Sequence, residues 1–104
     1  MAGNEESVFR KAKSEYQALQ ILQVLMLREA CGRSNDSILG VCLDKCGMYG
    51  APEEIRAVIS FLERSGLVRT DKVEEYVIVA ITDAGERVAE GKQIVDGVAR
   101  PTRK

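Results

Sequence analysis

The sequence predicts a mostly α-helical domain with a small β-hairpin, and three observations point to it. A stretch without proline or glycine from residue 5 to residue 30 predicts a long first helix. Two shorter amphipathic segments follow, at residues 38–45 and 52–65, with a glycine-bounded turn between them. Two runs rich in β-branched residues, 67–70 and 76–81, then precede a last short helix. This order of three helices, a two-stranded wing and a C-terminal helix is that of a winged helix-turn-helix.

The long first segment has the pattern of a helix that is buried on more than one side. Asn4 is expected to cap it, and the helix should run to Ala30 and end at Cys31 and Gly32. An apolar surround of this kind contacts either the domain's own core or another subunit, as in a homodimer through this helix. Six residues share one face and four more make the second half apolar nearly all round: Phe9, Ala12, Tyr16, Leu19, Gln23 and Met26, then Ile21, Leu22, Val24 and Leu25.

Two shorter helices joined by a tight turn form the predicted helix-turn-helix. The polar cluster at residues 34–37 is expected to cap a helix from Ile38 to Lys45, which ends at Gly47. Pro52 opens the third helix, and Ser65–Gly66 ends it. The helix at residues 38–45 is expected to bury one set of side chains: Ile38, Leu39, Cys42, Leu43 and Cys46. The helix that begins at Pro52 should bury Ile55, Val58, Ile59 and Leu62.

The rest of the chain is predicted as a hairpin, a capped helix and a tail. Strands at 67–70 and 76–81 should be joined by a polar tip at residues 71–75. Thr82 and Asp83 cap a last helix that stops near Gly91. We therefore divide the chain into a winged-helix domain at residues 1–91 and a basic, loosely ordered C-terminal tail at residues 92–104.

Two phrases resemble bacterial winged-helix regulators, and a longer stretch is similar to phage proteins. Residues 61–68 resemble the junction at which a recognition helix ends at a glycine and a Leu-Val pair begins the wing, and residues 81–91 resemble the connection after the wing. Residues 16–101 resemble a family of small winged-helix proteins of Mu-like transposable bacteriophages and prophages. The resemblance implies a phage origin and this fold, and it brings no activity with it. Its matching pieces are the first helix, Asn35–Leu39, Gly66–Val68 and the distinctive tail Val95–Pro101.

Composition favours a small binding domain over an enzyme. The chain has 104 residues, enough for one domain, of which 45% are hydrophobic and 30% charged. It contains no histidine, the commonest general base, and no glycine-rich phosphate loop, so we expect neither enzyme activity nor a cofactor. Its acidic start and the lack of a long apolar stretch indicate a cytoplasmic protein of a bacterial host cell that does not bind membranes.

The helix-turn-helix order predicts double-stranded DNA as the partner, because the second helix of such a motif enters the major groove. Arg56, Ser60 and Arg64 lie at i, i+4 and i+8, opposite the apolar face, and form a candidate DNA-facing stripe. A solvated charged face is the plainer explanation of the same pattern. The other candidate contacts lie in the wing and at the borders of the motif: Arg69, Lys72, Lys45 and Arg33.

The charge balance argues against tight DNA binding. The whole chain has a net charge of −1, and residues 51–81 carry four basic and six acidic side chains, a net charge of −2. The recognition helix also begins with Glu53 and Glu54. Since phosphate neutralisation supplies most non-specific affinity, we expect weak duplex binding that falls with salt. The alternative is a winged helix that binds a phage or host protein and no DNA.

Three cysteines leave one further alternative open. Cys42 and Cys46 lie four residues apart on one helix, and with Cys31 they are weak candidates for a metal site. Because free cysteine behaves as a small apolar residue, packing in the core is the favoured interpretation.

Overall fold

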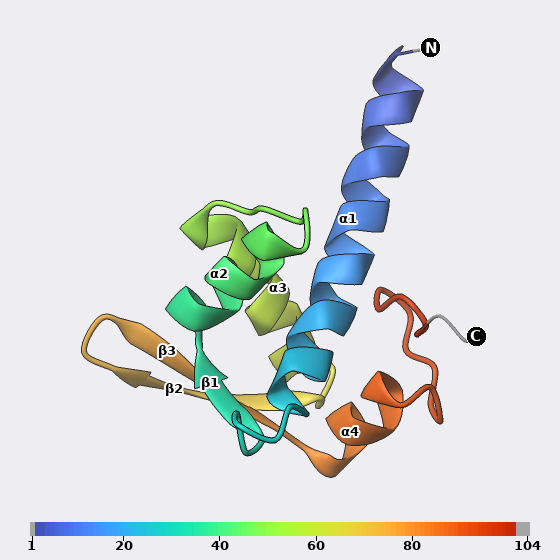
Figure 1. Cartoon of the computed structure of the whole chain (residues 1–104). Coiled ribbons are helices and arrows are strands. Elements are labelled where there is room, and N and C mark those ends of the chain that lie inside the picture. Colours follow the sequence, from blue (N-terminus) through green and yellow to red (C-terminus); the bar gives the residue numbers. More distant parts are fainter. Residues whose placement is uncertain (1, 102–104) are drawn as a thin grey trace.

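Four helices and a three-stranded antiparallel sheet make up the part of the chain that the structure describes (Figure 1). This computed structural model describes residues 2–101. Strand β3 is central in the sheet, between β1 and β2, and the whole is compatible with a mostly helical domain that carries a small hairpin. In chain order the elements are α1 (Ala2–Leu25), β1 (Arg33–Asn35), α2 (Asp36–Lys45), α3 (Pro52–Arg64), β2 (Val68–Val73), β3 (Tyr76–Ile81) and α4 (Asp83–Ala89).

The hydrophobic core lies between the second half of α1, the pair α2 and α3, and the inner face of the sheet. All four apolar residues predicted for the third helix are buried in α3, which confirms its amphipathic pattern. In α2 the pattern holds only in part, because Ile38 and Cys46 are exposed and Cys42 is half-buried. The most completely buried side chains are Ile21, Leu22, Leu25, Leu39, Leu43, Ile55, Ile59, Leu62, Leu67 and Val79.

The first helix differs from its prediction in both its end and its buried face. Helix α1 ends at Leu25 instead of Ala30, and residues 26–32 form turns that finish at Cys31 and Gly32 with φ angles of 55° and 80°. The Gly32 carbonyl then accepts a hydrogen bond from the Ile81 N–H at 2.8 Å, so pairing with β3 overrides the helical tendency of the preceding residues. The predicted face is buried only in part, since Leu19 is in the core, Ala12 and Gln23 are half-buried, and Phe9, Tyr16 and Met26 are exposed.

Strand β1 is an element that the sequence analysis missed. Its three residues are polar and have no strand pattern, but they pair in register with β3, Arg33 opposite Ala80 and Asn35 opposite Ile78. Helix α2 begins directly afterwards, at Asp36 instead of Ile38. Asn35 caps it by accepting a hydrogen bond from the Ile38 N–H at 2.9 Å.

The hairpin is longer than predicted. Strand β2 runs to Val73, which pairs with Tyr76, so the turn consists of Glu74 and Glu75 alone instead of residues 71–75. Glu74 adopts a positive φ of 56°, as a two-residue turn requires. The predicted tip residues Asp71 and Lys72 are therefore strand residues, and they face Ile78 and Val77.

The two phrases that resemble regulators contact each other at the junction of α3, β2 and α4. The Thr82 hydroxyl donates to the Gly66 carbonyl at 2.8 Å and accepts from the Gly85 N–H at 3.1 Å. A Cβ atom on Gly85 would lie 2.2 Å from the Leu67 carbonyl oxygen. Only glycine allows α4 to approach the start of the wing this closely.

Residues 92–101 pack on the helices, so the expectation of a loosely ordered tail is wrong for them. Val98 is buried, and the Ala99 N–H donates to the Glu15 carbonyl in α1 at 3.1 Å. Gly97 lies against the ring of Phe61 in α3 with a φ of 95°. The distinctive segment Val95–Pro101 thus joins α1 to α3, whereas residues 102–104 lie outside the described part of the chain.

Candidate functional site

Helix α3 presents a polar face to solvent. Its core side is fixed by its apolar residues, and Pro52 begins its first turn. Arg56, Ser60 and Arg64 are all exposed on the opposite face, and Ala57 lies exposed among them. This face is the candidate contact surface of the molecule, and we call these four residues the α3 face.

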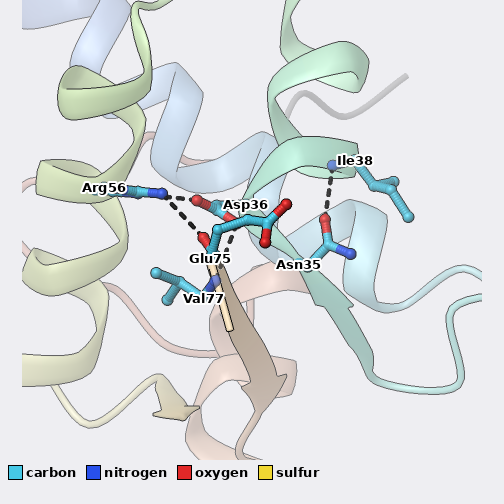
Figure 2. Close-up of polar contacts among 6 residues, drawn as sticks. All are labelled: Asn35, Asp36, Ile38, Arg56, Glu75 and Val77. Carbon is cyan, nitrogen blue, oxygen red and sulfur yellow. Dashed lines mark hydrogen bonds and ion pairs between the residues drawn. The ribbon is translucent and has the colours of Figure 1, made fainter. Parts of the chain in front are cut away.

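The guanidinium of Arg56 is held by two other elements (Figure 2). Its Nε donates to Oδ2 of Asp36 at 2.9 Å, and its Nη2 donates to the Glu75 carbonyl oxygen at 3.2 Å. The Oδ1 atom of Asp36 accepts from the Val77 N–H at 3.0 Å. Arg56 therefore ties the start of α3 to the start of α2 and to the turn of the hairpin, and its charge is matched within the fold.

Asp36 is the central residue of this network. Its side chain is only 8% exposed. Burial raises the pKa of a carboxyl, but the hydrogen bonds from the Val77 N–H and Arg56, together with the charge of Arg56, outweigh it and hold the pKa of Asp36 below its ordinary value. The sequence analysis gave Asp36 only a place in a capping cluster. Asp36 and Arg56 are 20 positions apart with no pattern that would connect them, so the sequence carries no signal of the pair.

Two acidic side chains of α3 have partners in other elements. Glu54 forms an ion pair with Lys13 of α1, with 3.3 Å between the charged atoms. Glu63 accepts a hydrogen bond from the Thr70 hydroxyl of β2 at 2.8 Å. The start of α3 is therefore less acidic toward solvent than its sequence indicates, and Glu53 is the carboxylate of its first turn that stays fully exposed.

The structure divides the candidate cations of the sheet between two sides. Arg33 and Arg69 both pair with Ala80, so they lie in one row across the sheet and their side chains point to the same side. The side chain of Lys72 points to the other side of β2, as does that of Thr70, whose hydroxyl donates to Glu63 of α3. Lys72 thus lies on the side of the α3 face, whereas Arg33 and Arg69 lie on the outer side. Lys45 is exposed at the end of α2, next to the turn between α2 and α3.

The three cysteines are not brought together. Cys31 and Cys46 are exposed and Cys42 is half-buried, and all three are free thiols. Within the described residues, no group of three or more cysteine or carboxylate side chains is arranged to hold a metal ion. The weak metal candidates Cys31, Cys42 and Cys46 therefore do not form a site. No helix among residues 2–101 is long and apolar enough to span a bilayer.

Comparison with known proteins finds a phage relative. The chain is 35% identical over 88 residues to the protein described as uncharacterized protein gp26 of Escherichia phage Mu, a match that spans 85% of this chain and 90% of the relative. The chain belongs to the gp26 family of Mu-like phages. Membership of the gp26 family supports a bacteriophage origin. No protein-family model matches the chain, and no solved structure matches it.

Proposed function

We propose that this member of the gp26 family is a non-catalytic winged-helix module that binds duplex DNA weakly, in a regulatory or DNA-handling role in the host cytoplasm. The order of α1, β1, α2, α3 and the β2–β3 hairpin, with β3 central, supports the winged-helix assignment. In this proposal α3 lies in the major groove and the hairpin is the wing.

The observation that carries the proposal is the exposed α3 face, which includes the cation Arg64, together with the cation Lys72 beside it. Arg64 and Lys72 are exposed on the α3 side of the molecule, and within the described residues neither takes part in an ion pair. Ala57 and Ser60 of the α3 face are exposed and small, so the helix backbone can approach the edges of the bases. The carboxylate of Glu54 is paired with Lys13, and that of Glu63 accepts a hydrogen bond from the Thr70 hydroxyl.

The internal role of Arg56 sets the expected strength. Because Asp36 matches the charge of Arg56, two cations remain for phosphate contacts on this side, Arg64 and Lys72. Each neutralised phosphate lowers the slope of log K against log salt by about 0.9, so a slope of about −2 is expected for this module. A free Arg56 would make it about −3.

A duplex titration by fluorescence anisotropy, with salt varied from about 20 to about 200 mM, tests the proposal. The double variant Arg64→Gln with Lys72→Gln should bring the slope close to zero. The matched control is Arg33→Gln with Arg69→Gln, which removes the same number of charges from the outer side of the sheet and should leave the slope unchanged. Absence of duplex binding at the lowest salt, or equal effects of the two double variants, would rule out DNA binding by the α3 face.

A second candidate is a protein partner at the same surface. The specific observation is the charge of the wing turn, where Glu74 and Glu75 are both exposed, together with exposed Glu53 at the start of α3. Such a surface suits a basic protein segment. Cross-linking in prophage-induced cells, with links mapped by mass spectrometry, should then place the partner on α3 and the hairpin, and Glu53→Gln with Glu74→Gln and Glu75→Gln should remove those links.

A further inference from the structure

The first half of α1 carries an apolar stripe that faces solvent. Val8 and Phe9 are 68% and 67% exposed, and Tyr16 is 48% exposed. With Ala12 they are spaced by three and four residues, so they lie along one side of the helix, turned away from the core face of its second half. Figure 1 shows this half of α1 extending beyond the other elements. A shallow groove along it is lined by Asn4, Glu5, Val8, Phe9 and Ala12.

The charges around the stripe are arranged in blocks of opposite sign. Glu5 and Glu6 come before Val8 and Phe9, and Arg10, Lys11 and Lys13 come after them. Glu5, Glu6, Arg10 and Lys13 line a second shallow groove beside Phe9, so both signs border the same apolar side chain. Among the described residues, Lys13 is paired with Glu54, whereas Arg10 and Lys11 take part in no ion pair.

We propose that two copies of the chain associate through this stripe, with their α1 helices antiparallel. A two-fold axis between Val8 and Phe9 places the acidic block of one copy level with the basic block of the other, twice, by symmetry. The same axis brings the two pairs of Val8 and Phe9 side chains into contact. A parallel pair would instead set Glu5 and Glu6 against the same residues of the second copy, and like charges at that distance repel.

The expected dimer is weak. The stripe from residue 5 to residue 16 is about 18 Å long at a rise of about 1.5 Å per residue. Two such stripes bury less than the roughly 1,200 Å² at which stable interfaces begin, so a dissociation constant of about 10–100 µM is expected. The association needs no DNA, and it is measured separately from duplex binding.

Sedimentation equilibrium of the full chain, from about 5 µM to about 1 mM, tests the proposal across that range. The wild-type mass should rise from monomer to dimer. Val8→Ser with Phe9→Ser should weaken association at least about tenfold, as expected for the loss of the two central apolar anchors. The matched control is Val41→Ser with Tyr49→Ser, a similarly exposed apolar pair on α2 and the following turn, and it should associate like the wild type. Circular dichroism checks that all variants fold.

Charge exchange tests the antiparallel direction. Glu5→Lys with Glu6→Lys should weaken self-association, and so should Arg10→Glu with Lys11→Glu. An equimolar mixture of these two variants should recover association, because each of the two charge contacts in the mixed antiparallel pair would join a basic block to an acidic one. The chain carrying all four substitutions restores both contacts and should dimerise like the wild type. A monomeric wild type up to 1 mM (about the highest usable concentration), equal loss in the Val41 and Tyr49 control, or no recovery in the fourfold variant would each overturn the proposal.

Discussion

The two halves of α1 both carry apolar side chains, four among residues 4–16 and six among residues 17–25, but these side chains have opposite surroundings. From Gln17 to Leu25 nearly every side chain is buried among α2, α3, α4 and the sheet, whereas from Asn4 to Tyr16 the apolar side chains lie mostly in solvent. The difference arises because the core encloses the second half on nearly all sides, whereas α3 and the segment after α4 contact the first half near its end, at Lys13 and Glu15. An apolar stripe in a helix therefore shows that something covers it, and the fold decides whether that is the same chain.

Truncation of one side chain in each half should give the largest contrast. Leu22→Ala removes a side chain with no exposed surface and should lower the free energy of unfolding by about 2–5 kcal/mol. Phe9→Ala removes an exposed ring and should change it by less than about 0.5 kcal/mol, since alanine also favours the helix. Urea denaturation at a few micromolar protein, roughly where the proposed dimer is dissociated, measures both. Equal losses would mean that the first half belongs to the folding core.

A second pair of variants tests whether a close backbone contact inside the domain tolerates an added methyl group. Gly85→Ala places a methyl group 2.2 Å from the Leu67 carbonyl oxygen, and we expect a loss of about 3 kcal/mol or failure to fold. Gly40→Ala in α2 is the control, because its Cβ would meet nothing within 4 Å. That change should stabilise the protein by about 0.5–1 kcal/mol through helix propensity. Thermal unfolding of the two variants should thus shift in opposite directions.

The network at the start of α2 and α3 should show an effect of intermediate size. Asp36→Ala leaves both Arg56 and the Val77 N–H without their acceptor and should cost about 2–3 kcal/mol, whereas Asp36→Asn keeps an acceptor and should cost about 1–2 kcal/mol. Denaturant titration at neutral pH separates the two. A loss below about 0.5 kcal/mol for Asp36→Ala, the size of an ordinary surface substitution, would show that the hairpin turn is positioned by its strands alone.

The same residue gives a pH dependence whose sign follows from its lowered pKa. The ionised form of Asp36 is favoured in the folded state, so its contribution is fully present above the unfolded pKa of about 3.9 and is lost as pH falls through the lower folded value. Wild-type stability should therefore drop below about pH 4 more steeply than that of Asp36→Asn. Parallel curves for the two proteins would mean that the ion pair with Arg56 contributes no net stability.

The sequence predicted the elements that depend on local patterns and missed those that depend on distant partners. The period of Ile55, Val58, Ile59 and Leu62 predicted α3, because an amphipathic helix buries whatever face is apolar. Strand β1 was missed because Arg33–Asn35 has no strand propensity and forms only through pairing with β3. The end of α1 was placed too late for the same reason, since the chain leaves the helix to reach that strand.

The candidate site shows the same limit. The spacing of Arg56, Ser60 and Arg64 placed them correctly on one side of a helix, but spacing cannot show that Arg56 is held by Asp36. It also cannot show that Lys13 holds Glu54. Both pairs join residues far apart in the sequence. Charge counts along the chain therefore overstated the number of unpaired acidic and basic side chains on α3.

The smallest expected effect concerns local opening of the first half of α1. An isolated helix shorter than about 12–15 residues is marginal in water, and the ion pair and hydrogen bond that join residues 4–16 to other elements lie near the end of this half, at Lys13 and Glu15. Their amides should therefore exchange hydrogen much faster than those of residues 17–25, which open only with the whole domain. Ala12→Gly should speed exchange in the first half further, by about fivefold for a propensity loss of about 1 kcal/mol, without changing global stability.

Exchange measured at low and at high protein concentration tests both the association through the apolar stripe and the division of α1 into two halves. Protection of residues 4–16 that rises with concentration fits association through the stripe, whereas equal protection of both halves at low concentration would contradict the division of α1.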